Sequence, residues 1–445
     1  MNGISHQSPP AMRILMVVEN ISRKMGGETG QNFYYLQLLR KRNIDVRAIC
    51  HSRVREELRQ EFAEDLEQFQ KIHFIDDTWY QVMIWRIGKV FPYRIQDLIF
   101  NQIIHWITQA QARKFAKKLI AKHPIDLIFE PTPITPKGLS FMYDMGVPVV
   151  IGPLTGGLKF PPAFEYMDSK FSQLSVNISR KLSGILHRFV PGKLQANSLI
   201  VANQQTVEAL PKGYQGKIYE VIESGVDLSL WPARQAQTPQ CDQSVRFIYA
   251  GRFVDWKGVQ FLVEAFQKVA DHSNAVLELV GQGQLEEQLQ NRVQALGLQD
   301  SVNFHGWQSS ESVNQLLREC DVFVMPSLRE AGGNAIMEAM AIGLPTVGTN
   351  WAGPARILDT SCAILVDPTS PEQFTEGLSQ AMIRLAESPQ LCEQMGEAAK
   401  QRVRQHYFDW DSKCDRIVEI FSETLHQSQT ESVVQSLVSS VKLPV

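Results

Sequence analysis

Apolar runs of strand length alternate with helix-length stretches along most of this 445-residue chain. The first run, residues 13–18, is followed by a glycine-rich loop at 25–30 and then by apolar side chains at helical spacing. A buried strand, a glycine loop and a helix in this order are typical of the first unit of a Rossmann-like domain. Because strands that alternate with helices pair in parallel and are covered on both faces, the pattern predicts an α/β fold.

A change of composition divides the alternation into two halves. Residues 228–244 hold two prolines and little periodicity, which is typical of a linker. Further strand candidates before this linker lie at residues 45–49, 72–75, 125–129, 147–151, 198–201 and 218–222. Strand candidates after it lie at residues 245–250, 275–280, 302–304, 322–325, 346–347 and 363–366.

This division predicts two Rossmann-like domains that face each other across a cleft. We expect residues 1–227 to form an N-terminal domain and residues 245–407 to form a C-terminal domain, joined by the linker at 228–244. The amphipathic helix at 408–427 is expected to cross back to the N-terminal domain, and 428–445 to form a flexible tail. Ligands of parallel sheets bind outside the carboxyl ends of the strands, so the site is expected in the cleft.

The composition argues against several classes of protein. Hydrophobic residues make up 44% and charged residues 20%, so the chain is not mainly disordered. Its net charge of −3 argues against a dedicated nucleic-acid binder. The six cysteines form no CxxC pair, which argues against a zinc site or a disulfide framework and favours a reducing compartment. The apolar runs are too short to span a membrane, so we expect a cytoplasmic protein that can still sit on a membrane surface.

The segment 251–258, Gly-Arg-Phe-Val-Asp-Trp-Lys-Gly, follows a predicted strand and opens a predicted helix. Arg252 and Lys257 place two cations near a helix N-terminus, where the helix dipole and free amides also attract anions. Cations held there would stabilise the negative charge that a leaving diphosphate gains. An ordinary strand-to-helix turn with exposed basic residues gives the same pattern, so this segment alone leaves both interpretations open.

The segment 326–338 combines two acids with a glycine turn. Glu330 lies in the predicted loop, and Glu338 lies on the second turn of the following helix. Two carboxylates that flank a glycine turn can bind two polyols at once, because carboxylates accept paired hydroxyl bonds well. The alternative is one solvated acid and one acid favoured by the helix dipole.

Together the two segments resemble those of retaining glycosyltransferases of family 4, which have the two-domain GT-B fold. Glu330 and Glu338 match that family's pair of glutamates separated by seven residues, and Arg252 and Lys257 match its diphosphate-binding cations. The resemblance implies that Glu330 contacts the donor sugar and Glu338 the ribose hydroxyls, while Trp307 belongs to a loop that lines the base. The donor-binding residues that it implies besides Glu338 are Gly27, Gly251, Gly281, Trp307, Gly332, Gly333 and Asn334.

The N-terminal half resembles the family more loosely. Its glycine loop at 26–28 matches a loop that approaches the donor phosphate and the acceptor. Glu130 stands where many members have a histidine, so no histidine base is assigned. The loop 152–157, Gly-Pro-Leu-Thr-Gly-Gly, resembles a branch whose members build exopolysaccharides or lipid-linked glycans. The acceptor-side residues implied in this way are Gly26, Glu28, Glu130, Thr155 and Gly156.

One stretch, residues 79–122, combines aromatic side chains with a high positive charge. It holds eight Lys/Arg residues against the single acid Asp97, a local charge of +7. Basic and aromatic surfaces suit anionic membrane interfaces, so we expect peripheral contact with the inner face of a membrane through this stretch. The alternative is a solvated helix whose aromatic residues belong to the core.

The resemblance implies a hexosyltransferase that moves a sugar from a nucleotide sugar to a hydroxyl of a glycan or lipid-linked acceptor, with retention of anomeric configuration. It implies no metal and no cofactor beyond the nucleotide sugar, because Arg252 and Lys257 would neutralise the charge that a metal neutralises elsewhere. Two other classes stay open. One is a GT-B-shaped epimerase or phosphorylase, and the other is a catalytically silent scaffold.

Overall fold

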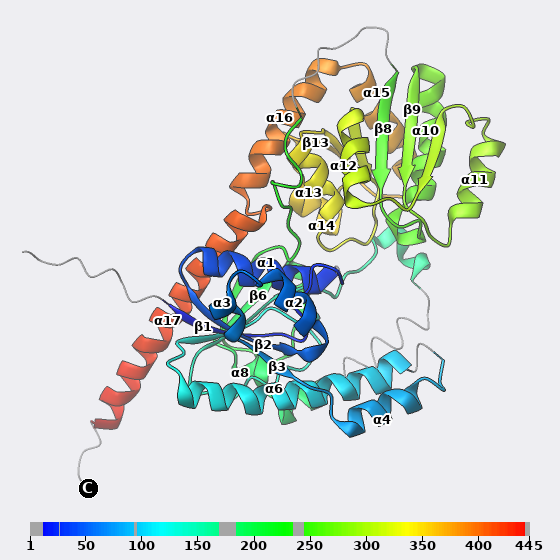
Figure 1. Cartoon of the computed structure of the whole chain (residues 1–445). Helices are drawn as coiled ribbons and strands as arrows, with labels where there is room; N and C mark the ends of the chain where they lie inside the picture. Colours follow the sequence, from blue (N-terminus) through cyan, green and yellow to red (C-terminus); the bar gives the residue numbers. More distant parts are fainter. Residues whose placement is uncertain (1–11, 26, 93–95, 169–183, 235–243, 441–445) are drawn as a thin grey trace, which may run out of the picture.

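The computed structural model describes residues 12–25, 27–92, 96–168, 184–234 and 244–440, and Figure 1 shows their arrangement. Two sheets follow each other along the chain. One has seven strands in the order β3-β2-β1-β4-β5-β6-β7, and the other has six in the order β10-β9-β8-β11-β12-β13. The described strands pair in parallel with their neighbours. The predicted α/β class with two Rossmann-like domains is therefore confirmed.

The first domain begins with the predicted strand and helix. Its strands are β1 (Arg13–Val17), β2 (Asp45–His51), β3 (Ile72–Ile75), β4 (Leu127–Glu130), β5 (Val149–Leu154), β6 (Ser198–Val201) and β7 (Lys217–Glu220). Its helices are α1 (Gly27–Lys41), η1 (Ser52–Val54), α2 (Arg55–Glu61), α3 (Leu66–Gln70), α4 (Trp79–Gly88), η2 (Gln96–Asn101), α6 (Gln102–Lys122), η3 (Pro162–Met167), α8 (Gly192–Gln195) and α9 (Gln204–Ala209).

Alternate residues of β1 pack in two different hydrophobic clusters, because successive side chains of a strand point to opposite faces of the sheet. Ile14 and Met16 pack in a cluster with residues of α1 and of the last helix, α17 (Trp410–Ser440). Leu15 and Val17 pack in a second cluster with residues of α6. The first sheet is thus buried on both faces, as its continuous apolar runs predict.

The second domain repeats the pattern of strand and helix. Its strands are β8 (Val245–Ala250), β9 (Ala275–Val280), β10 (Val302–Gly306), β11 (Val322–Met325), β12 (Thr346–Thr349) and β13 (Ala363–Val366). Its helices are η4 (Asp255–Lys257), α10 (Val259–His272), α11 (Glu286–Ala295), α12 (Ser310–Glu319), α13 (Asn334–Ile342), α14 (Ala352–Ile357), α15 (Pro371–Ala386) and α16 (Pro389–Gln405).

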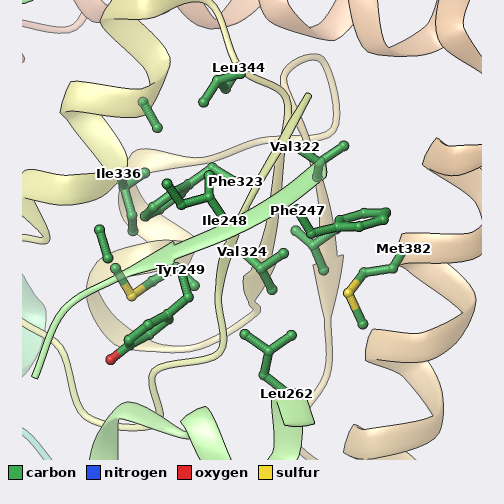
Figure 2. Packing of buried hydrophobic residues seen from close by; sticks show 14 of the residues in the cluster. Phe247, Ile248, Tyr249, Leu262, Val322, Phe323, Val324, Ile336, Leu344 and Met382 are labelled. Carbon is green, nitrogen blue, oxygen red and sulfur yellow. The ribbon is translucent and has the colours of Figure 1, made fainter. Parts of the chain in front are cut away.

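The core of the second domain forms on both sides of β8. Figure 2 shows Phe247 near Met382 on one side of this strand, and Ile248 near Ile336 on the other. All four side chains are fully buried. Strand β8 pairs with β11, so the loops that follow these two strands leave the sheet next to each other. This pairing brings together the two segments that the sequence analysis singled out.

Helix α17 joins the two domains by crossing back onto the first one (Figure 1). Trp410 at its start stacks on Tyr34 of α1 with ring centroids 5.0 Å apart, and Phe421 packs against Phe129 of β4. The helix continues to Ser440, whereas the sequence predicted a flexible tail from residue 428. Residues 426–440 contain no glycine or proline, so nothing in the sequence stops the helix there.

A segment of the first domain also packs into the second. Phe164 of η3 lies edge-on to Phe261 and Phe374, with ring centroids 5.5 and 5.9 Å apart. Just before it, the carbonyl oxygen of Lys159 accepts a hydrogen bond from the indole of Trp351, at 2.9 Å. These contacts and α17 fix how the carboxyl edges of the two sheets face each other. Among the described helices, none has the length and hydropathy needed to cross a bilayer.

Candidate functional site

Lys257 and Glu330 form an ion pair between the loops that follow β8 and β11. Both side chains are largely buried, and the hydroxyl of Ser327 lies 3.4 Å from the same carboxylate oxygen of Glu330. The two loops are also joined by their backbones, because the amide of Leu328 donates to the carbonyl oxygen of Trp256 at 2.9 Å. The structure thus brings together two residues that lie 73 positions apart and that were both predicted to act on the donor.

Gly258 allows the loops after β8 and β11 to approach each other, and Gly281 does the same for the loops after β8 and β9. Gly258, at the start of α10, has a φ of 71°, and a Cβ atom there would overlap the carbonyl oxygen of Pro326. Gly281 has a φ of 138°, and a Cβ atom there would overlap the carbonyl oxygen of Gly251. Glycine is needed at both positions, because residues with a side chain rarely adopt these φ values and because there is no space for a Cβ atom. Arg252 follows Gly251 in the chain and is exposed to solvent.

The glycine turn before α13 is held against the first domain. Gly332 packs so closely on Ser224 that a Cβ atom would overlap the serine side chain. Gly333 has a φ of 88° and serves as the N-cap of α13, whose first residue is the exposed Asn334. The first amides of a helix have no partner within the helix and are available to an anionic or polyhydroxyl ligand.

Glu338 lies on α13, on the side facing the first domain. Burial raises the pKa of Glu338 to about 7. The charge of Glu338 also affects Tyr34 of α1. The pKa of Tyr34 is raised to about 12, mainly by burial, then by the charge and hydrogen bond of Asp227, and more weakly by the charge of Glu338. Glu338, predicted to bind the donor, therefore lies close enough to Tyr34 of α1 for its charge to act across the junction of the two domains.

A buried pair next to this site was missed by the sequence analysis. Glu223 is 4% exposed, and Lys413 of α17 is fully buried and donates a 2.6 Å hydrogen bond to the carbonyl oxygen of Ile222. Burial raises the pKa of Glu223, and the charge of Glu330 adds to that shift. Burial lowers the pKa of Lys413 to about 7. The segment 223–227 was noted as a turn, but no sequence signal shows that a lysine of the last helix meets it.

Trp307, predicted to line the base, follows β10 at the edge of the second sheet and is 73% exposed. Gly26 lies outside the described residues. Gly27 is the first residue of α1, and the backbone of Glu28 lies in the same helix. The structure therefore places the start of α1 at the first glycine loop.

The acceptor-side residues are not gathered at one surface. Glu130 is fully buried at the end of β4, where it accepts a 2.5 Å hydrogen bond from Ser140, and burial raises its pKa. The side chain of Glu130 points into the first domain and not to its surface, and its assignment to the acceptor side stays a prediction. Thr155 and Gly156 are half-buried, and the amide of Gly156 donates to the hydroxyl of Thr206 at 3.2 Å.

Comparison with known sequences agrees with the assignment of the second domain. The family described as "Glycosyl transferases group 1" matches residues 234–402. The lipopolysaccharide core biosynthesis glycosyltransferase LpsD of Rhizobium meliloti is 34% identical over 158 residues, which cover 35% of this chain and 43% of LpsD. The chain spans less than half of the length of the curated relatives that it matches.

Solved structures match nearly the whole chain. A glycosyltransferase from Rickettsia africae has a TM-score of 0.58 at 18% identity, over 94% of this chain and 99% of that one. HepE from Anabaena, in complex with UDP, has a TM-score of 0.57 at 19% identity, over 93% of this chain and 100% of HepE. At these identities the likeness concerns the fold. The chain therefore has the GT-B fold, and its residues 234–402 match the group 1 glycosyl transferases.

Proposed function

We propose that the protein is a retaining glycosyltransferase that moves a sugar from a nucleotide sugar to a hydroxyl of a glycan or lipid-linked acceptor. The observation that carries this proposal is the ion pair between Lys257 and Glu330, with Glu338 on the second turn of the helix that follows. These residues lie at the carboxyl edge of the second sheet, inside the segment that matches the group 1 family.

The positions of the charges support a division of roles. Lys257 and the exposed Arg252 would hold the donor diphosphate, and Glu330 would accept hydrogen bonds from the transferred sugar. As the bond between the sugar's C1 and the phosphate oxygen breaks, a new bond forms from C1 to the acceptor oxygen on the same face. The leaving diphosphate takes the acceptor's proton, so no separate base is needed. We expect no metal requirement, which a transfer assay in excess EDTA tests directly.

The acceptor side of the proposal includes a membrane surface. Helix α4 and the residues after it expose apolar side chains, including Trp79 at 76% and Val90 at 85% exposure, beside Arg86 and Lys89. Exposed aromatic and apolar side chains next to cations suit an anionic bilayer. Helix α6, by contrast, places part of its apolar face in the core. The alternative interpretation of residues 79–122, a helix whose apolar side chains belong to the core, therefore fits α6 better than α4. We propose that α4 rests on the membrane that carries the acceptor.

Direct donor binding and turnover test the proposal. HepE binds UDP and UDP-glucose, so uridine nucleotides are the first to try, followed by guanosine and adenosine nucleotides. Calorimetry measures nucleotide binding, and NMR of the product reports the anomeric configuration. We expect one nucleotide to bind and its sugar to be transferred with retention. No turnover with any nucleotide sugar would contradict the proposal, and turnover without an acceptor to an isomeric sugar would indicate an epimerase.

A further inference from the structure

The glycine turn before α13 is held by two separate contacts. From the second domain, the amide of Gly353 donates a 2.9 Å hydrogen bond to the carbonyl oxygen of Glu330. From the first domain, Ser224 and Glu223 pack on Gly332. A Cβ atom at Gly332 would overlap the serine side chain and would lie 2.9 Å from Oε1 of Glu223. The turn that was predicted to bind the donor sugar is therefore shaped in part by the first domain.

The last helix fixes the segment of the first domain that touches this turn. Lys413 of α17 donates a 2.6 Å hydrogen bond to the carbonyl oxygen of Ile222. The amide of Val226 donates to the carbonyl oxygen of Phe408 at 2.9 Å, and the carbonyl oxygen of Val226 accepts from the amide of Trp410 at 3.0 Å. These bonds lie on either side of the two residues that touch the turn, so the position of those residues is set by α17.

The carboxyl group of Glu223 is suited to an uncharged contact. Burial raises the pKa of Glu223, the charge of Lys413 works to lower it, and the charge of Glu330 raises it further. Two neighbouring carboxyl groups resist ionising together, and Glu330 already has Lys257 as its partner. The proton is therefore favoured on Glu223. A glutamine, which is uncharged and has the same shape, is a close substitute for this group.

The helix that carries Glu338 is supported differently. Ile336, Met337 and Met340 of α13 are fully buried in the core of the second domain. The position of Glu338 therefore depends on packing within the second domain, whereas the position of Gly332 depends also on the first. The nucleotide part and the sugar part of the proposed donor site are thus held in place by different contacts.

We propose that Glu223 and Ser224 are positioning residues for the transferred sugar, because their contact with Gly332 holds the glycine turn in the shape that binds it. The inference rests on the proposed function and adds a condition to it. Recognition of the sugar needs the contact between the two domains, whereas recognition of the nucleotide does not. Domain closure would then complete the sugar part of the site around a nucleotide that is already bound.

Gly332→Ala tests this contact from the side of the turn. Gly332 does not have a positive φ, so alanine fits its backbone, and the atoms nearest to the added methyl group belong to Ser224 and Glu223. We expect affinity for a nucleotide sugar to fall at least about tenfold, and affinity for the nucleotide diphosphate to stay within about twofold of the wild type. In the control, Gly184→Ala, the same group meets no atom of the described residues within 4 Å.

A second substitution in the same chain shows whether the contact itself is responsible. Ser224→Gly removes the two atoms nearest to the added methyl group. The double variant Gly332→Ala, Ser224→Gly should therefore regain the affinity of the wild type for the nucleotide sugar, because the methyl group fills the space that the serine leaves.

Substitutions of Glu223 test the same contact from the side of the first domain. Glu223→Gln should keep the affinity of the wild type for the nucleotide sugar, and Glu223→Ala should lose it without losing affinity for the nucleotide. The probes are UDP with UDP-glucose, then GDP with GDP-mannose and ADP with ADP-glucose, each measured by calorimetry on the full-length protein. Where Glu223→Ala disturbs the fold, Gly332→Ala and its double variant keep the test valid.

Three results would overturn the inference: unchanged sugar affinity in Gly332→Ala, an equal loss for the nucleotide and the nucleotide sugar, or no recovery in the double variant. An equal loss would show a merely structural role, and no recovery would show that the methyl group itself blocks the sugar. The wild type alone judges the proposed function, which fails where no nucleotide sugar is bound, and the inference then fails with it. Where the wild type binds but the variants depart from this pattern, only the inference fails.

Discussion

Lys257 and Glu330 meet as an ion pair across two loops whose strands, β8 and β11, are neighbours in the second sheet. The pair is shielded from water, so each charge depends on the other for its stabilisation. A diphosphate that binds here would draw Lys257 toward its own charge and leave Glu330 available to the hydroxyl groups of the sugar. In the proposed function the pair would therefore link phosphate binding to sugar binding through one contact.

Replacing either cation of this site should remove most of the turnover. Lys257→Ala and Arg252→Ala each lose a group that stabilises the leaving diphosphate, and we expect kcat to fall at least 100-fold, or ~2.7 kcal/mol of transition-state stabilisation. Lys268→Ala is the matched control, because Lys268 is exposed on α10 and pairs with Glu376. Circular dichroism checks the fold. Unchanged turnover in both Lys257→Ala and Arg252→Ala would refute the diphosphate assignment.

Nucleotide binding should depend on the ionisation of Glu338. Its pKa is raised to about 7 by burial, so its carboxylate forms over the range from pH 6 to pH 8. The ionised form accepts hydroxyl bonds more strongly, and we expect wild-type affinity to rise through this range. Glu338→Gln should bind more weakly, by about tenfold at pH 8. Calorimetry at several pH values measures the difference between the two proteins, and equal affinities at pH 8 would count against a ribose contact.

The same pKa shift predicts an effect on stability in the absence of ligand. The folded protein holds the Glu338 proton up to about pH 7, whereas the unfolded chain releases it near pH 4.5. The folded state binds more protons between these values, so this group stabilises the protein below pH 4.5 and its contribution is lost as pH rises to 7. We expect Glu338→Gln to gain thermal stability relative to the wild type on going from pH 5 to pH 8. A constant difference in Tm over that range would contradict the shift.

Most of the fold can be predicted from local patterns. Strands such as β8 and β11 are short apolar runs bounded by polar loops, and both were predicted with their observed limits. Lys257 and Glu330 were assigned to one site through the resemblance to family 4. The structure brings them together because β8 and β11 are neighbouring parallel strands, so that the loops after them leave the sheet side by side. The alternation of strands and helices predicts the parallel sheets but not this order of strands.

The remaining part depends on contacts that no local pattern contains. Glu130 ends strand β4, where a ligand-binding residue could lie, yet its side chain turns inward to Ser140. Lys413 donates to the carbonyl oxygen of Ile222, next to Glu223, because α17 returns to the first domain. Such groupings are set by tertiary packing, so spacing along the chain could not reveal them.

Two glycines with the same backbone angle separate steric from conformational effects. Gly258 and Gly297 both have a φ of 71°, but a Cβ atom at Gly297 would meet nothing within 4 Å, whereas at Gly258 it would overlap Pro326. We expect Gly297→Ala to cost about 1–2 kcal/mol and to keep its turnover. Gly258→Ala should cost about 3 kcal/mol or more and lose turnover, because η4 must move and carries Lys257 with it. Scanning calorimetry gives the stabilities, and equal losses in the two variants would show that the contact with Pro326 is unimportant.

Binding to anionic membranes should depend on the cations beside the apolar surface of α4. Each Lys or Arg near such a membrane contributes ~1 kcal/mol, so the double variant Arg86→Glu, Lys89→Glu should bind at least tenfold more weakly. The matched control is Lys212→Glu, Arg384→Glu, which reverses two exposed charges on other helices and loops. Cosedimentation with phosphatidylglycerol vesicles measures binding, and phosphatidylcholine vesicles show how much of it is electrostatic. Equal binding by both double variants would show that α4 does not rest on the bilayer.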